Sequence, residues 1–434
     1  MIMTENPIVR NAALSKQLQT VPVGELKLGM VVHAIAEQAG KLGVKSKGEI
    51  KHLRIIDQLT ASGVKSVLVE YPQRKVDQAL IKLNAQRNKV FERKKYKAAV
   101  IESIEPVDAS NNQLEFDNAA NLLRISESIY TNFTTAIHKN QSIDFTETKN
   151  LVANVYASLA KTPDALLCMS MIMHSSDYIA NHSIHVATLL CYFAHQLNCP
   201  KDECEKLALI GYLFDVGMVK IPEAIRLKKG TLTESEQDEM KLHVAYSLNI
   251  LEPLKLDREY LLAVEQHHER LNGSGYPYGY SGSKIHKFSR MLAIVDCYDA
   301  LTTAREHQLP LSPAAAMKVL SNPDHGYDQK LVLQFIRCMG IYPVGSLVVL
   351  SNKRIGLVTK TNRKAPTSPE VKVFYSVTGN HFVSPEVINL FDVASADKRS
   401  DKSADKKVKS NNKGLRVLKP VLASQFGLKM ENIV

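Results

Sequence analysis

"EQHHERLNGSGYPYG", residues 265–279, decides the fold, because it ends an apolar helical run with two adjacent histidines and then enters a glycine-rich turn. Glycines such as Gly275 permit positive φ angles and close backbone approach, and Pro277 stiffens the turn. Tyr276 is therefore predicted to lie rigidly beside the histidines, where its ring could stack on a purine base. A plain Gly-Pro loop would be the simpler interpretation if the turn did not follow "HHE" directly.

Seven of the chain's 14 histidines lie between His174 and His268, where apolar residues recur at three- and four-residue intervals, as in helices. A single inward-facing histidine is more often a hydrogen-bonded core residue than a ligand, and His185 is predicted to be packing of that kind. Burying four imidazoles and two carboxylates together is costly unless they are paired or hold a metal. This set consists of His182, Asp215, His243, His267, His268 and Asp296.

Mixed nitrogen and oxygen ligands of this kind suit iron, manganese or zinc. A carboxylate that bridges two ions, surrounded by histidines, is the arrangement used for two-metal hydrolysis of a phosphodiester. One position does not fit. In "GYLFDVGMVKIP", residues 211–222, Asp215 is preceded by Phe214, which cannot bind a metal.

The rest of the chain predicts a mainly α protein with a helical bundle, a small N-terminal α+β domain and a short β-rich C-terminal appendage. "GVKSVLVE" and "EVKVFYSV" are typical of strands, whereas "DKRSDKSADKKVKS" is typical of disorder. The tail is therefore expected to be dispensable for folding. The predicted segments are an N-terminal domain at 1–71, a basic linker at 72–116, the helical domain at 117–340, the β-rich appendage at 341–391 and a largely disordered tail at 392–434.

The formal net charge of +11 is concentrated in two segments. Residues 72–99 have nine basic and two acidic side chains, and residues 397–419 have nine basic and three acidic ones. Both are predicted to be solvated connectors, and without zinc-finger spacing or an RNA-binding aromatic motif no nucleic-acid partner is expected. The six cysteines form no CxxC pair. Without an apolar run of about 18 residues or a secretory signal, the chain is predicted to be cytoplasmic and not inserted in a membrane.

"HHERLNGSGYP", "YIANHS", "FDVG" followed by "IP", and "VDCYDALTTAR" together resemble the HD-GYP domain family over roughly residues 120–340. These are bacterial metal-dependent phosphohydrolases that cleave cyclic di-GMP, and their fold is a helical HD bundle. The resemblance implies a divalent metal cofactor, iron or manganese first, and cyclic di-GMP as the ligand. A second signalling protein that docks on the Gly-Tyr-Pro loop is a further partner it suggests.

Carried over by residue, the resemblance implies a first metal site of His182, the His-Asp doublet and Asp296. It implies a second site of Asp215, His243, His267 and His268, with Asp215 bridging both sites as the catalytic residue. Substrate contacts are expected from Gly275, Tyr276, Pro277 and Arg305.

Several positions depart from the family pattern. The doublet is Phe214-Asp215, and the lysine that the family places three residues after the aspartate is Met218. Asn272 and Gln308 are further departures. Two functions remain open at this point. One is a cyclic-di-GMP phosphodiesterase with reduced activity, working with one ion instead of two. The alternative is an inactive cyclic-di-GMP receptor or protein-docking scaffold.

Overall fold

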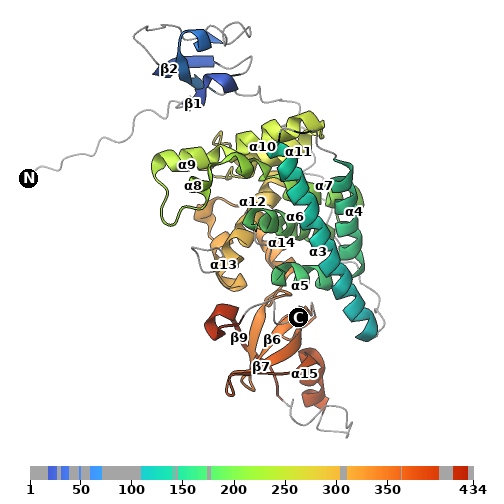
Figure 1. Ribbon diagram of the computed structural model, residues 1–434. Coiled ribbons are helices and arrows are strands. Elements are labelled where there is room, and N and C mark those ends of the chain that lie inside the picture. Colours follow the sequence, from blue (N-terminus) through green and yellow to red (C-terminus); the bar gives the residue numbers. More distant parts are fainter. Residues whose placement is uncertain are drawn as a thin grey trace, which may run out of the picture. The chain divides into compact units, whose positions relative to one another are not determined.

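The computed structural model (Figure 1) describes residues 18–26, 31–38, 48–49, 59–70, 109–139, 141, 145–173, 177–303, 310–362, 364–399 and 414–428. The chain divides into two compact units, Met1–Leu83 and Asn84–Val434. Within the described ranges, no helix is both long enough and apolar enough to cross a membrane.

The N-terminal unit contains a four-stranded antiparallel sheet with the order β1-β4-β2-β3. Its elements are β1 (Leu18–Pro22), the 3-10 turn η1 (Val23–Glu25), β2 (Val31–Gln38), β3 (Gly48–Glu49) and β4 (Val64–Glu70). Alternating valines of β4 are buried, with Val67 and Val69 fully enclosed, as expected for a strand with one face on a core. The segment "EIKHLRIIDQLTAS", residues 49–62, is predicted as the helix of this α+β domain, and most of it lies outside the described residues.

The second unit is mainly helical, which confirms the predicted fold class. Its longer helices are α3 (Ala109–His138), α4 (Thr146–Lys161), α5 (Pro163–Ile172), α6 (Tyr178–Gln196), α7 (Lys201–Leu213), α9 (Glu234–Lys241), α10 (His243–Leu251), α11 (Arg258–Gln266), α12 (Lys287–Thr302), α13 (Pro313–Leu320) and α14 (Gln329–Met339). Shorter turns are η2 (Val216–Lys220), α8 (Glu223–Arg226), η3 (Glu252–Leu254), η4 (Gly282–Lys284) and η5 (Pro323–His325). Helix α3 begins inside the segment predicted to be a basic linker.

Helix α6 is the centre of the bundle. Almost all of its residues from Ile179 to Ala194 are buried, so it is mostly apolar, as a helix enclosed by others must be, and its few polar side chains are buried with it. Asp177 caps its first turn by accepting hydrogen bonds from the backbone N–H groups of Ile179 and Ala180. His182 and His185 are therefore held deep in the protein by a helix that packs on all faces.

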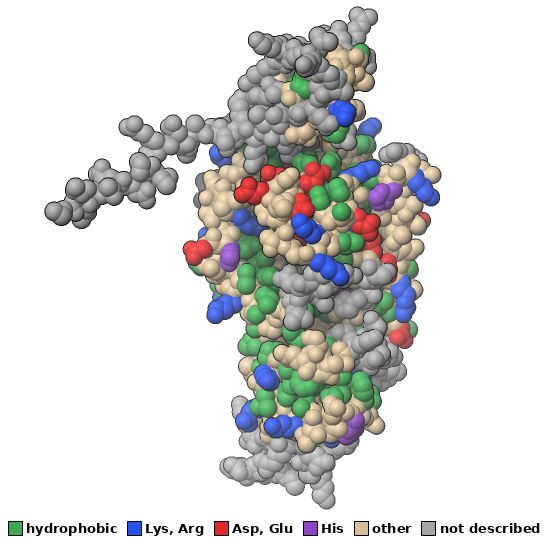
Figure 2. All heavy atoms as spheres, turned by 60° about the vertical axis from the view of Figure 1, so that its left-hand side comes forward, with side chains coloured by type: hydrophobic (Ala, Val, Ile, Leu, Met, Phe, Trp, Pro, Cys, Tyr) green, Lys and Arg blue, Asp and Glu red, His purple; other side chains and the backbone are tan. Residues whose placement is uncertain are grey.

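A five-stranded antiparallel sheet of order β8-β7-β6-β5-β9 completes the second unit. Its elements are β5 (Leu347–Leu350), β6 (Arg354–Lys360), β7 (Glu370–Ser376), β8 (His381–Asn389), α15 (Leu390–Arg399), β9 (Val417–Val421) and η7 (Ala423–Phe426). One face of the sheet joins the bundle core through residues such as Ile355 and Leu357. Three hydrophobic side chains of the sheet, Phe382, Val387 and Leu418, are exposed. Figure 2 shows hydrophobic side chains at the surface of the lower part of the molecule.

The C-terminal segment corrects the prediction of a largely disordered tail. Residues 414–428 return to the sheet, and β9 pairs antiparallel with β5, with Val421 opposite Leu347. Val421 and Leu428 are buried in the main core. The prediction was wrong here because a short strand beside a charged, low-complexity run has little apolar periodicity of its own. Residues 400–413, the most polar part of the predicted tail, lie outside the described residues.

Ending the chain after Asp392 is expected to lower stability by more than about 4 kcal/mol, or roughly 8 °C in melting temperature. The truncation removes four buried aliphatic side chains, Val393, Leu415, Val421 and Leu428, each of which contributes about 1.5–3 kcal/mol when fully buried. Thermal unfolding would measure the change. A chain ending at Leu428 is the control and should melt like the full chain. Equal melting of both truncations would show that β9 does not contribute to stability.

Candidate metal centre

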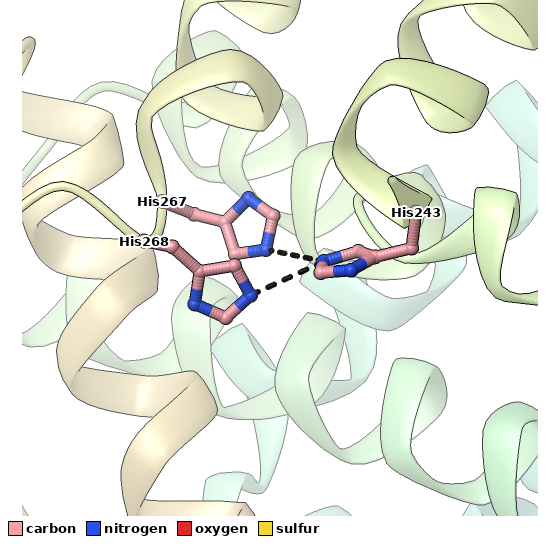
Figure 3. Close-up of side chains that lie close together, drawn as sticks. All are labelled: His243, His267 and His268. Atoms are coloured by element: carbon pink, nitrogen blue, oxygen red, sulfur yellow. Dashed lines mark hydrogen bonds between the residues drawn. The ribbon is translucent and has the colours of Figure 1, made fainter. Parts of the chain in front are cut away.

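Three histidines from two helices converge on one point of the bundle (Figure 3). His243 is the first residue of α10, and His267 and His268 directly follow α11. His243 Nε2 lies 3.4 Å from His267 Nε2 and 3.1 Å from His268 Nε2. These three nitrogens form a group that could hold a metal ion.

The backbone determines which ring nitrogens face the centre. His243 Nδ1 lies 2.8 Å from the Met240 carbonyl oxygen, and His267 Nδ1 lies 2.7 Å from that of Val264. A carbonyl can only accept, so each Nδ1 carries the proton and each Nε2 presents a lone pair to the centre. Two lone pairs facing one another repel unless a cation or a proton lies between them.

The electrostatics of the group favour neutral rings. Burial lowers the pKa of His243, although the nearby Asp215 carboxylate acts in the opposite direction. Burial and the adjacent His267 and His243 rings hold the pKa of His268 well below its ordinary value. Neutral imidazoles are the form that binds a metal ion.

Asp215 adds a carboxylate to this group. It follows the end of α7 and precedes η2, and its Oδ1 lies 3.4 Å from His243 Nε2 and 3.6 Å from His267 Nε2. This oxygen is buried and, among the described residues, has no hydrogen-bond partner. An unpartnered buried carboxylate oxygen beside three imidazole nitrogens is a donor set that fits a divalent ion.

Gly217 allows Asp215 to approach α10. A Cβ atom at this position would lie 2.2 Å from the His243 carbonyl oxygen and 2.3 Å from the Ser247 nitrogen. The Gly217 N–H also donates to Ser247 Oγ at 2.8 Å. Because only glycine fits, η2 packs directly on α10 and brings Asp215 to the histidines.

The other predicted ligands, His182 and Asp296, lie on α6 and α12. His182 Nε2 is 3.0 Å from Asp296 Oδ1. Burial alone would lower the pKa of His182, but hydrogen bonds with Asp296 and Asp299 and their charges raise it to about 10. The two side chains therefore form an ion pair, and they can serve as a second, smaller set of metal ligands only when an ion replaces the proton on His182 Nε2.

Phe214 lies between the two donor sets. Its ring is fully buried, and its centroid is 5.7 Å from that of His182 and 5.1 Å from that of His267, edge-on to both. An aromatic hydrocarbon, which offers no metal ligand, therefore packs against a histidine of each set.

Asp299 and His185 belong to this region but were not predicted as site residues. Asp299 is completely buried, and its carboxylate lies 2.7 Å from His182 Nδ1 and 3.2 Å from His185 Nδ1. His185 is thus buried, as expected, but it takes part in a polar network. A signal was present in the sequence, because His182 and His185 are three residues apart on one helix and Asp296 and Asp299 are three apart on another, so each pair shares a face.

The Gly-Tyr-Pro loop, residues 271–280, is attached to the same centre. The Tyr276 ring stacks on that of His268 with centroids 4.5 Å apart. The backbone N–H of Tyr276 donates to the His268 carbonyl oxygen at 3.2 Å. Gly275 makes this possible, since a Cβ there would lie 2.4 Å from the same carbonyl oxygen. The chain crosses from Tyr276 to Pro277 through a cis peptide bond.

Glu269 fixes the far side of this loop and was also missed from the sequence. Its buried carboxylate accepts hydrogen bonds from the N–H groups of Tyr278, at 2.7 Å, and Tyr280, at 2.9 Å. Burial raises the pKa of Glu269, and these backbone hydrogen bonds partly offset that effect. The loop is therefore held from both ends by consecutive residues, His268 and Glu269.

Other positions are less closely involved. Met218 is half-buried and packs against the hydrophobic core. Lys241 places its ammonium group 6.0 Å from the centroid of the Tyr276 ring. Arg305 and Gln308 lie outside the described residues.

Three family models match the chain. An HD domain matches residues 166–331, the domain of unknown function DUF3391 matches residues 18–148, and a KOW domain associated with HD domain matches residues 347–395. The first of these contains the metal centre and the Gly-Tyr-Pro loop.

Curated relatives are cyclic-dinucleotide phosphodiesterases. A cyclic di-GMP phosphodiesterase of Pseudomonas aeruginosa is 32% identical over 58% of this chain and 61% of its own length. A 3'3'-cGAMP-specific phosphodiesterase of Vibrio cholerae is 33% identical over 36% of each chain. The chain thus spans less than two thirds of either relative. The solved structure of an HDG"Y"P protein from Bdellovibrio bacteriovorus aligns with 74% of this chain and 98% of its own, at 15% identity and a TM-score of 0.42.

Proposed function

Because the chain belongs to the HD-GYP family of HD domains, we propose that it binds cyclic di-GMP and cleaves it only slowly. One observation carries the proposal. Phe214 is fully buried between His182 and His267, at the position where the family pattern has a metal-binding histidine. The site would therefore keep its nucleotide-binding parts while one of its two ligand sets is incomplete.

The set of Asp215, His243, His267 and His268 would hold one divalent ion, iron or manganese. Three neutral imidazoles and a carboxylate suit either metal, and water can complete the coordination shell. Such an ion lowers the pKa of a bound water and polarises a phosphoryl oxygen. Asp215 would orient the attacking water by accepting its hydrogen bond, which is the role proposed for it as the catalytic residue.

The set of His182 and Asp296 would bind a second ion weakly. It has two direct ligands of its own besides the shared Asp215, and Phe214 contributes no donor atom. Met218 adds to the deficit, because a thioether cannot neutralise the negative charge that builds on phosphate oxygens in the transition state. A missing group of that kind typically costs about 100- to 1000-fold in rate.

Nucleotide recognition would rest on the Gly-Tyr-Pro loop. One face of the Tyr276 ring stacks on His268. Gly275, Pro277 and the hydrogen bonds that Glu269 accepts from the loop hold Tyr276 in place. Stacking on an aromatic ring contributes about 1–3 kcal/mol per base. Arg305 would add a phosphate contact. The intact loop beside a damaged metal site also supports the second candidate, a receptor without turnover that docks another signalling protein.

Metal content is the direct test, and we expect about one tightly held ion per chain. His267→Ala should lose that ion, because it removes a ligand from the complete set. His182→Ala should keep it, because His182 belongs to the incomplete set. Mass spectrometry of the purified proteins measures the metal content of both variants. A chromatographic assay of cyclic di-GMP turnover is run beside it.

Each candidate makes a different prediction in that experiment. A slow enzyme binds cyclic di-GMP and yields a trace of product that disappears in His267→Ala. A receptor binds without product at any time. Two tightly held ions, or fast turnover by the unaltered chain, would contradict the proposal, because Phe214 would then not be a defect.

A further inference from the structure

Asp299 accepts hydrogen bonds from three side chains in the interior of the bundle. Its carboxylate lies 2.7 Å from His182 Nδ1 and 3.2 Å from His185 Nδ1, and Thr303 Oγ1 donates to it at 3.1 Å. The residue is completely buried on α12, three positions after Asp296. Burying a carboxylate is costly, so its position among three donors calls for a role.

The contact determines how the His182 ring is used. A carboxylate can only accept, so the proton on the Asp299 side of the ring lies on Nδ1, 2.7 Å from Asp299. The opposite nitrogen, Nε2, donates a proton of its own to Asp296 Oδ1 at 3.0 Å, and a metal ion bound by both side chains would take the place of that proton. This is the orientation in which His182 and Asp296 can bind one ion together.

The two ligand sets differ in what supports their histidines. His243 and His267 are held by neutral backbone carbonyls, of Met240 and Val264. His182 is held by a full negative charge. A charged acceptor makes the opposite nitrogen a stronger donor to a metal. The stronger support thus belongs to the set that lacks a ligand.

We propose that Asp299 is a positioning residue, which fixes the ring of His182 for metal binding with Asp296 and partly offsets the ligand missing at Phe214. The inference rests on the proposed metal-dependent function. Asp299 would touch neither metal nor substrate and would act through His182 alone. Changing it should therefore affect one ligand set and spare the other.

The test compares Asp299→Asn with Thr303→Val in the full chain, both alone and combined with Phe214→His, which restores a third ligand. Thr303→Val is the matched control, because it removes one neutral donor to the same carboxylate and keeps the charge. Manganese binding is followed by electron paramagnetic resonance. Asp299→Asn should lower the affinity for the more weakly bound ion by roughly 10- to 100-fold and leave the affinity for the tightly bound ion unchanged. Thr303→Val should leave both unchanged.

Equal weakening of both ions by Asp299→Asn, with a lower melting temperature, would show a merely structural role and overturn the inference, as would no change in either ion. Nitrogen NMR of the histidine rings in Asp299→Ala gives an answer without metal. His182 should no longer be held with its proton on Nδ1, and an unchanged ring would overturn the positioning. Should no variant bind any ion, the proposed metal function fails, while the NMR result still decides the role of Asp299.

Discussion

Hydrolysis of cyclic di-GMP is expected to rise by roughly 100-fold or more when Phe214 becomes histidine and Met218 becomes lysine in the same chain. The histidine places a nitrogen between His182 and His267, where the Phe214 ring now lies 5.7 Å and 5.1 Å from them, centroid to centroid. It is smaller than phenylalanine and should fit without displacing its neighbours. The lysine has the unbranched stem of Met218 and can extend its charge toward water.

The two changes should act more than additively. A phosphate is positioned well only when the second ion is present, so the lysine alone has little to stabilise. Groups that work as a unit are strongly non-additive. Each single variant is therefore expected to be nearly silent, and a chromatographic assay of all four proteins gives the coupling.

Matched controls separate chemistry from packing. Phe214→Leu removes the ring and supplies no ligand, and Val219→Lys adds the same charge at a neighbouring position. Neither should gain activity. A buried histidine without a partner costs about 1–3 kcal/mol, so Phe214→His should also melt lower without metal and recover with manganese. A double variant that binds two ions and the nucleotide yet stays inert would contradict the repair and point to Gln308 or Asn272.

Gly217→Ala is expected to destabilise the protein by about 3 kcal/mol or more, at the upper end of what overpacking costs. The added methyl group would meet backbone atoms of His243 and Ser247 at 2.2 Å and 2.3 Å, and backbone cannot move aside as a side chain can. Turn η2 would have to separate from α10, which moves Asp215 away from His243. The urea concentration at the midpoint of unfolding and the metal content should therefore both fall.

Two substitutions isolate the steric cause. Ser247→Ala removes the hydrogen bond from the Gly217 N–H without crowding, and should cost only about 1 kcal/mol. Gly24→Ala, where a Cβ atom would have no neighbour within 4 Å, should be close to neutral. If Gly217→Ala were as mild as Gly24→Ala, the packing of η2 on α10 could not be what positions Asp215.

Helical periodicity was sufficient to predict the bundle, because α6 and α12 carry long apolar runs. The strands β5 to β7 were predictable from short segments rich in β-branched residues, whereas β8 was not predicted. Strand β9 was not, since it is stabilised by pairing with β5, a strand about 70 residues earlier, and this contact is not visible in local sequence.

The candidate site, like the fold, was only partly predictable from the sequence. Residue types and spacing suggested the metal-binding histidines, but not which atoms support them. Asp299 and Glu269 resembled ordinary helix and loop residues, and only the fold brings Asp299 against His182 and Glu269 against the loop N–H groups. Lys241 also drew no notice in the sequence, yet its ammonium group lies near the Tyr276 ring.

Under the proposed function, the order His267, His268, Glu269 would tie metal binding and nucleotide binding to one short piece of backbone. The first two offer their Nε2 atoms to the metal group, the second also carries the Tyr276 ring, and the third clamps the loop beyond it. A ligand that orders this tripeptide reduces the conformational entropy that is lost when the other ligand binds. Such coupling is reciprocal by thermodynamic necessity. An ion that raises the affinity for the nucleotide is therefore itself bound more tightly when the nucleotide is present. The chain could in this way report the metal supply and the nucleotide concentration as one combined signal, even with little turnover.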